Sequence, residues 1–196
     1  MSEIDRVLTY WFGATPEERG AKQKLWFGGG PDVDAEIRGT FGDLVEQARA
    51  GKLEAWSATP RGALAWLILV DQFSRNIYRN QPESFSADHA ALAWTRANLA
   101  KLETLSTIEQ LFAYLPFEHA EDLDTQKVSV TRFTRLGLRD DGDLEMMKLA
   151  VDSARKHLEV IARFGRFPHR NEILGRTSTA EETEYLAFAR KAKQWL

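Results

Sequence analysis

The stretch Ala63-Leu64-Ala65-Trp66-Leu67-Ile68-Leu69-Val70 is the longest apolar run in the chain. Thr59 and Pro60 come just before it, and a threonine cap followed by proline in the first turn is typical of a helix start. Because the run is apolar on every side, we predict a helix at the centre of the core. The run is too short to cross a bilayer.

Helical spacing continues on both sides of this central helix. Apolar residues recur three and four positions apart, and no stretch alternates apolar and polar residues for long enough to predict a strand. The sequence therefore predicts an all-α fold with eight or nine mostly antiparallel helices, arranged as a bundle or as a short superhelix of helix pairs. Residues 26–31 are expected to form a flexible break, and Pro116 to kink or break a further helix. We expect the other segments to start at Ser2, Thr15, Asp32, Ser86, Thr107, Phe117, Asp143 and Thr179.

Size and composition are those of an ordinary globular protein. The chain has 196 residues, 43% of them hydrophobic and 28% charged, which favours a single all-helical domain over residues 1–196. A formal net charge of -3 provides no positive field to hold nucleic acid or an anionic membrane, so we predict neither as a partner. Cysteine is absent, which excludes disulfides, thiolate nucleophiles and sulfur-bound zinc. The acidic start differs from a secretory signal, and the expected location is the cytoplasm.

Polar side chains directly follow the central helix. Residues 71–79 read Asp-Gln-Phe-Ser-Arg-Asn-Ile-Tyr-Arg, so the acid and the two arginines fall four positions apart. Such a group at the end of a buried helix needs protein partners or a ligand, because each unpaired buried polar group costs about 1–3 kcal/mol. A ligand site and an ion-pair ladder that closes the core are both open interpretations. The candidate ligand-binding residues are Asp71, Gln72, Arg75, Asn76 and Arg79.

A second polar group lies in residues 115–126, where four acids and one histidine follow the proline. On one continuous helix, Glu118 and Asp122 would share a face, with His119 three residues before Asp122. Two carboxylates and an imidazole together suit acid–base chemistry. Glu118 and His119 are therefore candidate catalytic residues, and Asp122 is a candidate ligand-binding residue. The alternative is that acids near a helix start only complement the helix dipole.

A third group, residues 162–176, carries four arginines, one histidine and a single acid around a glycine and a proline. Guanidinium groups stay ionised and fit carboxylate or phosphate oxygens two at a time, so this cluster predicts an anion site. Arg163, Arg166, Arg170 and Asn171 are the candidate ligand-binding residues, and His169 is a candidate proton carrier. The alternative is charge pairing with the acidic second group, although an arginine held on one edge can still present its other donors to a ligand.

The residues do not identify a cofactor, and we predict no metal site. One helix would supply two or three His and carboxylate ligands and would need others from elsewhere in the chain. His157 lies near an apolar stripe of its predicted helix, and we expect it to be structural.

The three polar groups, together with Val7-Leu8-Thr9-Tyr10-Trp11-Phe12-Gly13 and the pair Trp26-Phe27, resemble the DUF924 family of bacterial proteins. The resemblance extends from about Ile4 to Tyr185. It implies an all-helical fold similar to tetratricopeptide superhelices, and it implies no reaction. The basic ending, residues 187–196, departs from the family pattern, which puts a role of the extreme C-terminus in doubt.

Our leading hypothesis is that the three groups converge on one pocket for a small anionic molecule that carries phosphate or carboxylate. Arginines would hold the anion, and His119 or His169 would carry a proton if catalysis occurs. The alternative is a tetratricopeptide-like module that binds a peptide without catalysis. A homodimer contact at Trp195 is a further expectation.

Overall fold

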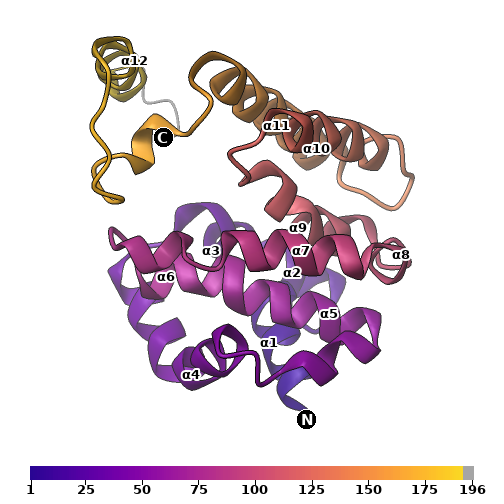
Figure 1. Cartoon of the computed structure of the whole chain (residues 1–196). Coiled ribbons are helices and arrows are strands. Elements are labelled where there is room, and N and C mark those ends of the chain that lie inside the picture. Colours follow the sequence, from indigo (N-terminus) through magenta and orange to yellow (C-terminus); the bar gives the residue numbers. More distant parts are fainter. Residues whose placement is uncertain (192–196) are drawn as a thin grey trace.

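The fold is built from α-helices. The computed structural model describes residues 1–191, apart from the side chains at positions 16, 20, 27 and 28, and no strand occurs in that range (Figure 1). The all-α prediction is confirmed, and eight of the helices in this range have eight or more residues. The α-helices are α1 (Glu3–Phe12), α2 (Pro16–Ala21), α3 (Gln23–Gly28), α4 (Pro31–Arg49), α5 (Pro60–Leu67), α6 (Ser74–Ile77), α7 (Asp88–Ala97), α8 (Leu99–Leu102), α9 (Thr107–Glu118), α10 (Leu123–Leu136), α11 (Leu144–Phe164) and α12 (Ala180–Lys191). Short 3-10 segments lie at Glu54–Ala58, Pro82–Phe85 and Pro168–Arg170.

The apolar run forms the centre of the core, as predicted. The Thr59 hydroxyl caps α5 by accepting a hydrogen bond of 3.0 Å from the backbone N–H of Gly62, and residues 62–71 are all buried. The helix then widens into a π-helical segment, Ile68–Phe73, before α6 continues it. This segment was not predicted. Because a π-helical turn holds more residues than an α-helical turn, it rotates the polar residues after residue 70 relative to α5.

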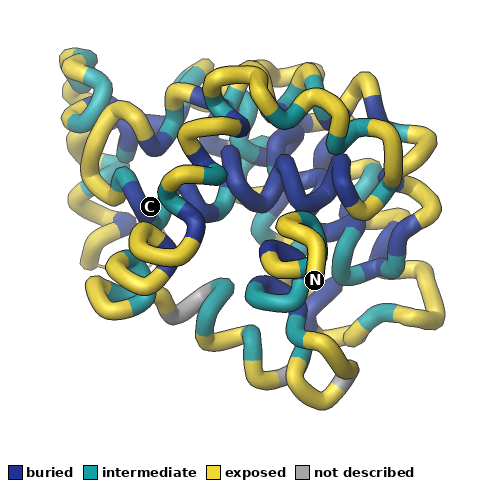
Figure 2. The backbone as a smooth tube through the Cα atoms, turned by 90° about the horizontal axis from the view of Figure 1, so that it is seen from below, coloured by how far each residue is buried: buried dark blue, intermediate teal, exposed yellow. Residues whose placement is uncertain are grey.

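Aromatic rings join the first helices to this central element. Figure 2 shows the buried residues gathered along the inner helices, with exposed residues on the outer turns. The ring of Phe73 lies 5.6 Å from Trp11 of α1 and 4.8 Å from Phe41 of α4, measured between ring centroids. Such contacts pack α1 and α4 against the helix that carries the first polar group.

Pro116 does not break its helix. α9 runs through Pro116 to Glu118, because its residues 110–114 and 116–118 are buried and this packing offsets the one helix hydrogen bond that the proline removes. The Asp122 carboxylate then caps α10 by accepting a hydrogen bond of 2.8 Å from the backbone N–H of Thr125. The prediction of one helix over residues 117–136 is therefore wrong at its start, and Glu118 and Asp122 do not share a helix face.

Two further boundaries differ from the sequence predictions. The break expected at residues 26–31 is shorter, because α3 extends into it and α4 starts directly after Gly30. Gly30 is the N-cap, so Asp32 lies in the first turn and does not cap the helix. The helix expected over residues 86–102 is divided at Asn98 into α7 and α8.

The C-terminal part consists of a helix pair and a peripheral helix. α10 packs against both α9 and α11, and the pair α10–α11 lies above the N-terminal helices in Figure 1. α11 ends at Gly165, whose φ of 69° is left-handed and therefore favours glycine. The chain then passes through the 3-10 turn Pro168–Arg170 to α12 at the edge of the molecule.

None of the helices within residues 1–191 is both long enough and apolar enough to span a membrane. Trp195, the residue of the expected dimer contact, lies outside the described residues. The tetratricopeptide-like arrangement stays a prediction.

Candidate functional site

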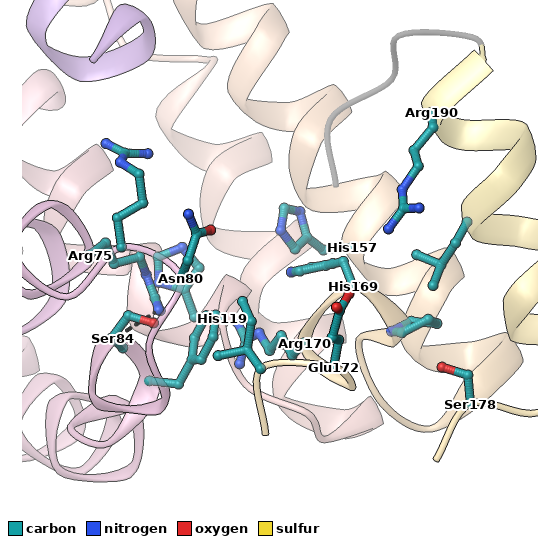
Figure 3. Close-up of a pocket in the computed structure, with 15 residues that line it drawn as sticks. Arg75, Asn80, Ser84, His119, His157, His169, Arg170, Glu172, Ser178 and Arg190 are labelled. Carbon is teal, nitrogen blue, oxygen red and sulfur yellow. Dashed lines mark hydrogen bonds between the residues drawn. The ribbon is translucent and has the colours of Figure 1, made fainter. Parts of the chain in front are cut away.

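A cavity of about 510 Å³ lies where the three polar groups approach one another. Figure 3 shows Arg75, Asn80 and Ser84 on one side, Ser178 and Arg190 on the other, and His157 and His169 between them. The lining residues are Arg75, Arg79, Asn80, Ser84, Phe85, His119, His157, Pro168, His169, Arg170, Glu172, Ile173, Ser178, Leu186 and Arg190. The structure thus brings members of all three predicted groups to one cavity.

Basic side chains outnumber acidic ones in the wall. Four arginines and three histidines line the cavity, whereas Glu172 is the one carboxylate among the lining residues. Within residues 1–191, no carboxylate forms an ion pair with Arg190, and this arginine is exposed. Its charge is therefore not compensated by a described neighbour.

Two of the arginines share one half-buried carboxylate. Asp88, at the start of α7, accepts a hydrogen bond of 2.9 Å from Arg75 Nη2 on one oxygen and one of 3.0 Å from Arg170 Nη1 on the other. Both guanidinium groups also lie over the ring of Phe85, at 5.0 Å and 4.6 Å from its centroid. Burial, and then the nearby Arg75, lower the pKa of Arg170 to about 10. The two arginines are therefore fixed in orientation, and their positive charges repel each other.

Asp71 holds His119 in the cavity wall. Asp71 Oδ1 lies 2.7 Å from His119 Nδ1, and Asp71 also accepts hydrogen bonds from Gln72 at 2.6 Å and Arg75 at 3.4 Å. Burial alone would raise the pKa of Asp71, but the nearby His119 and Arg75 lower it to about 2. Because the ionised Asp71 can only accept, Nδ1 of His119 donates this hydrogen bond, which leaves Nε2 for a ligand.

A second carboxylate–imidazole pair stands beside the first. Glu118 is buried, and its Oε1 lies 3.0 Å from His157 Nδ1 and 2.8 Å from Ser153 Oγ. The ring centroids of His157 and His119 are 6.5 Å apart. Burial raises the pKa of Glu118 to about 7, and burial lowers the pKa of His157 to about 3. His157 therefore stays neutral at pH 7.

His169 lies in the wall next to Arg170, as Figure 3 shows. Burial, and then the positive charges of Arg170 and Arg75, lower the pKa of His169 to about 4. The ring is therefore neutral at pH 7. A ligand that brings negative charge would favour its protonation.

The predicted ligand-binding residues Gln72, Asn76 and Asp122 do not line this cavity. Asn76 donates a hydrogen bond of 2.8 Å to Asp34, and Gln72 and Asn76 both line a different cavity. Arg79 lines both cavities and binds Asp34 through two nitrogens, at 2.5 Å and 2.8 Å. Asp122 caps α10 and lines a neighbouring, more apolar pocket.

Three candidates of the third group instead hold α12. Arg166 makes two hydrogen bonds to Glu182, of 2.7 Å and 2.8 Å, and Arg163 makes one of 2.8 Å to Glu181. Asn171 donates to the same Glu182 at 3.3 Å. These three do not line the cavity, whereas Arg170 does. The alternative of pairing with the acidic second group holds for Arg176, which binds Glu121 at 2.6 Å and 3.0 Å.

Sequence reasoning missed His157, Arg190 and Asp88. The apolar residues around His157 suggested a structural role, and Arg190 lies in the basic ending that departs from the family pattern. Asp88 lies two residues after the predicted helix start at Ser86, and no other sequence feature selected it. A signal existed for His157: it is four residues after Ser153 on α11, and both contact Glu118.

Within residues 1–191, no group of three or more His, Asp or Glu side chains is arranged to hold a metal ion. The three histidines of the cavity thus do not form a metal site with described neighbours. The wall offers guanidinium and imidazole groups, which suit an anion.

Comparisons with known proteins agree with this description. The family model described as a bacterial protein of unknown function, DUF924, matches residues 7–189. The chain belongs to the DUF924 family. This confirms the resemblance read from the sequence motifs. No curated protein matches the chain.

A solved structure is similar over nearly the whole length. It is that of the protein of unknown function ATU0120 from Agrobacterium tumefaciens, with 30% sequence identity and a TM-score of 0.79. The match covers 93% of this chain and 96% of that chain. The helical fold of this DUF924 protein is therefore shared with a solved relative.

Proposed function

We propose that this DUF924 protein binds a small anionic molecule of the cytoplasm, with a phosphate or carboxylate group, in the cavity between α6, α9, α11 and α12. The observation that carries the proposal is the lining of four arginines and three histidines against one carboxylate. A volume of about 510 Å³ suits a metabolite, since ligand pockets commonly measure about 300–1,000 Å³.

The anion would lie between Arg170 and Arg190. Arg170 is held by Asp88, but its Nε is buried and has no hydrogen-bond partner. A buried donor without an acceptor lowers the stability of the fold by about 1–3 kcal/mol, so an anionic oxygen that accepts from Arg170 Nε would stabilise the protein. Arg190 faces the same cavity from α12 (Figure 3). The anion would also reduce the repulsion between Arg170 and Arg75.

His119 is the group that we assign to acid–base chemistry on a bound substrate. The Asp71–His119 pair resembles the orientation of imidazole by a carboxylate in general-base catalysis, where the second ring nitrogen takes the proton. Glu118 is buried behind His157, so it would act through that ring and not by touching the ligand.

Binding is tested by calorimetry and thermal unfolding with inorganic phosphate as the probe. Arg190→Gln removes an exposed charge of the cavity, and we expect unchanged stability without phosphate and at least fivefold weaker binding. Arg163→Gln is the matched control, because Arg163 is exposed and lies outside the cavity. Equal phosphate binding by wild type and Arg190→Gln would contradict the proposal. Binding of an acidic peptide in preference to phosphate would favour the peptide-binding alternative.

A further inference from the structure

A second cavity, of about 470 Å³, shares Arg75 and Arg79 with the first. The proposed function does not use this second cavity. Among residues 1–191, its lining contains no acidic side chain. Its other walls are aromatic and amide groups, from Trp11, Leu25, Trp26, residues 29–31, Gln72 and Asn76.

Two tryptophans supply the aromatic wall. Trp26 of α3 donates a hydrogen bond of 2.9 Å from its indole Nε1 to the backbone oxygen of Trp11, which links the two residues. The indole Nε1 of Trp11 is itself buried and has no acceptor. The Trp11 ring packs in the core against Phe73 and Phe112, so Trp26 is the one of the two that supplies a flat apolar surface for a planar ring, and the Trp11 N–H is a donor that lacks a partner.

Two amides supply hydrogen-bond acceptors. Gln72 uses its Nε2 to donate to Asp71 at 2.6 Å, and Asn76 uses its Nδ2 to donate to Asp34 at 2.8 Å. These bonds fix both amides and leave their carbonyl oxygens as acceptors at the cavity. A wall with acceptors, one indole donor and aromatic faces matches a heteroaromatic ring that bears an amino group, because such a ring both donates and accepts along its edge.

Positive groups lie at the same cavity. Arg79 binds Asp34 through Nε and Nη2, which leaves Nη1 for another partner. α4, a helix of 19 residues, begins at the cavity wall with Gly30 as N-cap and no side-chain cap. Pro31 in its first position has no N–H and Asp34 N donates to the Gly30 oxygen, so the backbone N–H groups of Asp32 and Val33 are the ones left for an anion. A Cβ at Gly29 would lie 3.2 Å from Arg79 Nη2, so glycine allows the backbone to approach the guanidinium.

We propose that this second cavity binds a nucleoside monophosphate, with the amino-bearing base against Trp26 and the phosphate at Arg79 and the start of α4. The base donates to the carbonyl oxygens of Gln72 and Asn76 and accepts from the buried indole N–H of Trp11. Shared walls couple this site to the first cavity through Arg75 and Arg79.

The test compares three probes by calorimetry: AMP, adenosine, which lacks the phosphate, and ribose 5-phosphate, which lacks the base. We expect AMP to bind at least 10-fold more tightly than either part. Gln72→Leu keeps the volume of the side chain and removes the acceptor, so it should weaken AMP binding at least fivefold and leave ribose 5-phosphate binding unchanged. Gln47→Leu is the control, because Gln47 is exposed on α4 and lies outside the cavity.

A second measurement uses the unmodified protein. Nuclear Overhauser contacts between the base protons of AMP and the indole protons of Trp11 and Trp26 are expected. Equal affinity for AMP and ribose 5-phosphate, or base contacts elsewhere, would overturn the inference. The proposed function fails separately, since it depends on phosphate binding that is sensitive to Arg190→Gln, whereas this inference depends on the advantage of AMP over ribose 5-phosphate.

Discussion

Asp71 and His119 are 48 residues apart in the chain, yet Asp71 Oδ1 and His119 Nδ1 lie 2.7 Å from each other. The buried end of the central helix thus orients an imidazole that α9 delivers to the cavity. The carboxylate also contacts Arg75, so one side chain fixes both a histidine and an arginine of the wall.

Asp71→Asn tests the strength of this link. The pKa of Asp71 is lowered to about 2 by His119 and Arg75, which outweigh the opposing effect of burial. Its contribution to stability is therefore complete above the ordinary value of 3.8 and is lost as the pH falls toward 2. We expect Asp71→Asn to lower the free energy of unfolding by about 2 kcal/mol at pH 7, at about 1.4 kcal/mol per pKa unit, and to change it little at pH 2.

Urea unfolding at pH 7 and at pH 2.5 measures this difference. Asp124→Asn is the control, because Asp124 is exposed and its one ion pair within residues 1–191 is with the nearby Lys127. A loss for Asp71→Asn that is equal at both pH values would show that the charge of Asp71 is not what stabilises the fold.

Glu118→Gln should change the pH dependence in the opposite direction. Burial raises the pKa of Glu118 from 4.5 to about 7, so the folded protein keeps a proton that the unfolded chain releases. The stability contributed by this group is present below pH 4.5, declines as the pH rises, and is lost above about 7, a change of about 3 kcal/mol. The glutamine keeps Oε1 as acceptor for Ser153 and lacks this decline.

The measurement for Glu118→Gln is denaturant unfolding of wild type and variant at pH 5 and pH 8. The difference between wild type and variant in the pH dependence of the free energy of unfolding reports on Glu118, because the other titrating groups are the same in both proteins. The same change in the free energy of unfolding between pH 5 and pH 8 in both proteins would mean that Glu118 is ionised in the folded protein at neutral pH.

Anion binding should strengthen as the pH falls. Burial lowers the pKa of His169 to about 4, and a bound anion would raise it by favouring the imidazolium. Sulfate is the suitable probe, since its charge does not change over this range. We expect at least fivefold tighter sulfate binding at pH 5 than at pH 8, with proton uptake on binding, and a weaker pH dependence in His169→Gln. Calorimetry in two buffers of different ionisation enthalpy gives both quantities, and pH-independent binding would contradict the expectation.

Much of the helical framework could be predicted because its signals are local. The cap at Thr59, the apolar run after it and the left-handed glycine at 165 depend on neighbouring residues in the chain. The signal of Pro116 is also local, but the packing that holds α9 together through this proline is not. The π-helical segment has no sequence signal that we recognised.

The candidate site was predicted only in part, because its members depend on how distant segments meet. Arg163, Arg166 and Arg170 look equivalent in the sequence. Two of them bind glutamates of α12, and one is buried against Asp88. Arg170 lies in the short 3-10 turn after α11, whereas Arg163 and Arg166 precede this turn. Sequence periodicity does not predict in which direction the turn sends the chain. The second cavity escaped prediction because tryptophans at helical spacing, such as Trp11, indicate a core more often than a ligand site.

α12 contributes Leu186 and Arg190 to the first cavity, yet it is fastened mainly by a small apolar cluster and by Arg166 and Glu182. The helix that completes the wall is thus one of the less firmly attached parts. If the first cavity holds the proposed anion, opening of such a helix would govern how quickly the anion leaves. We then expect its residence time to depend on the Arg166–Glu182 contact, at a distance from the groups that recognise the anion.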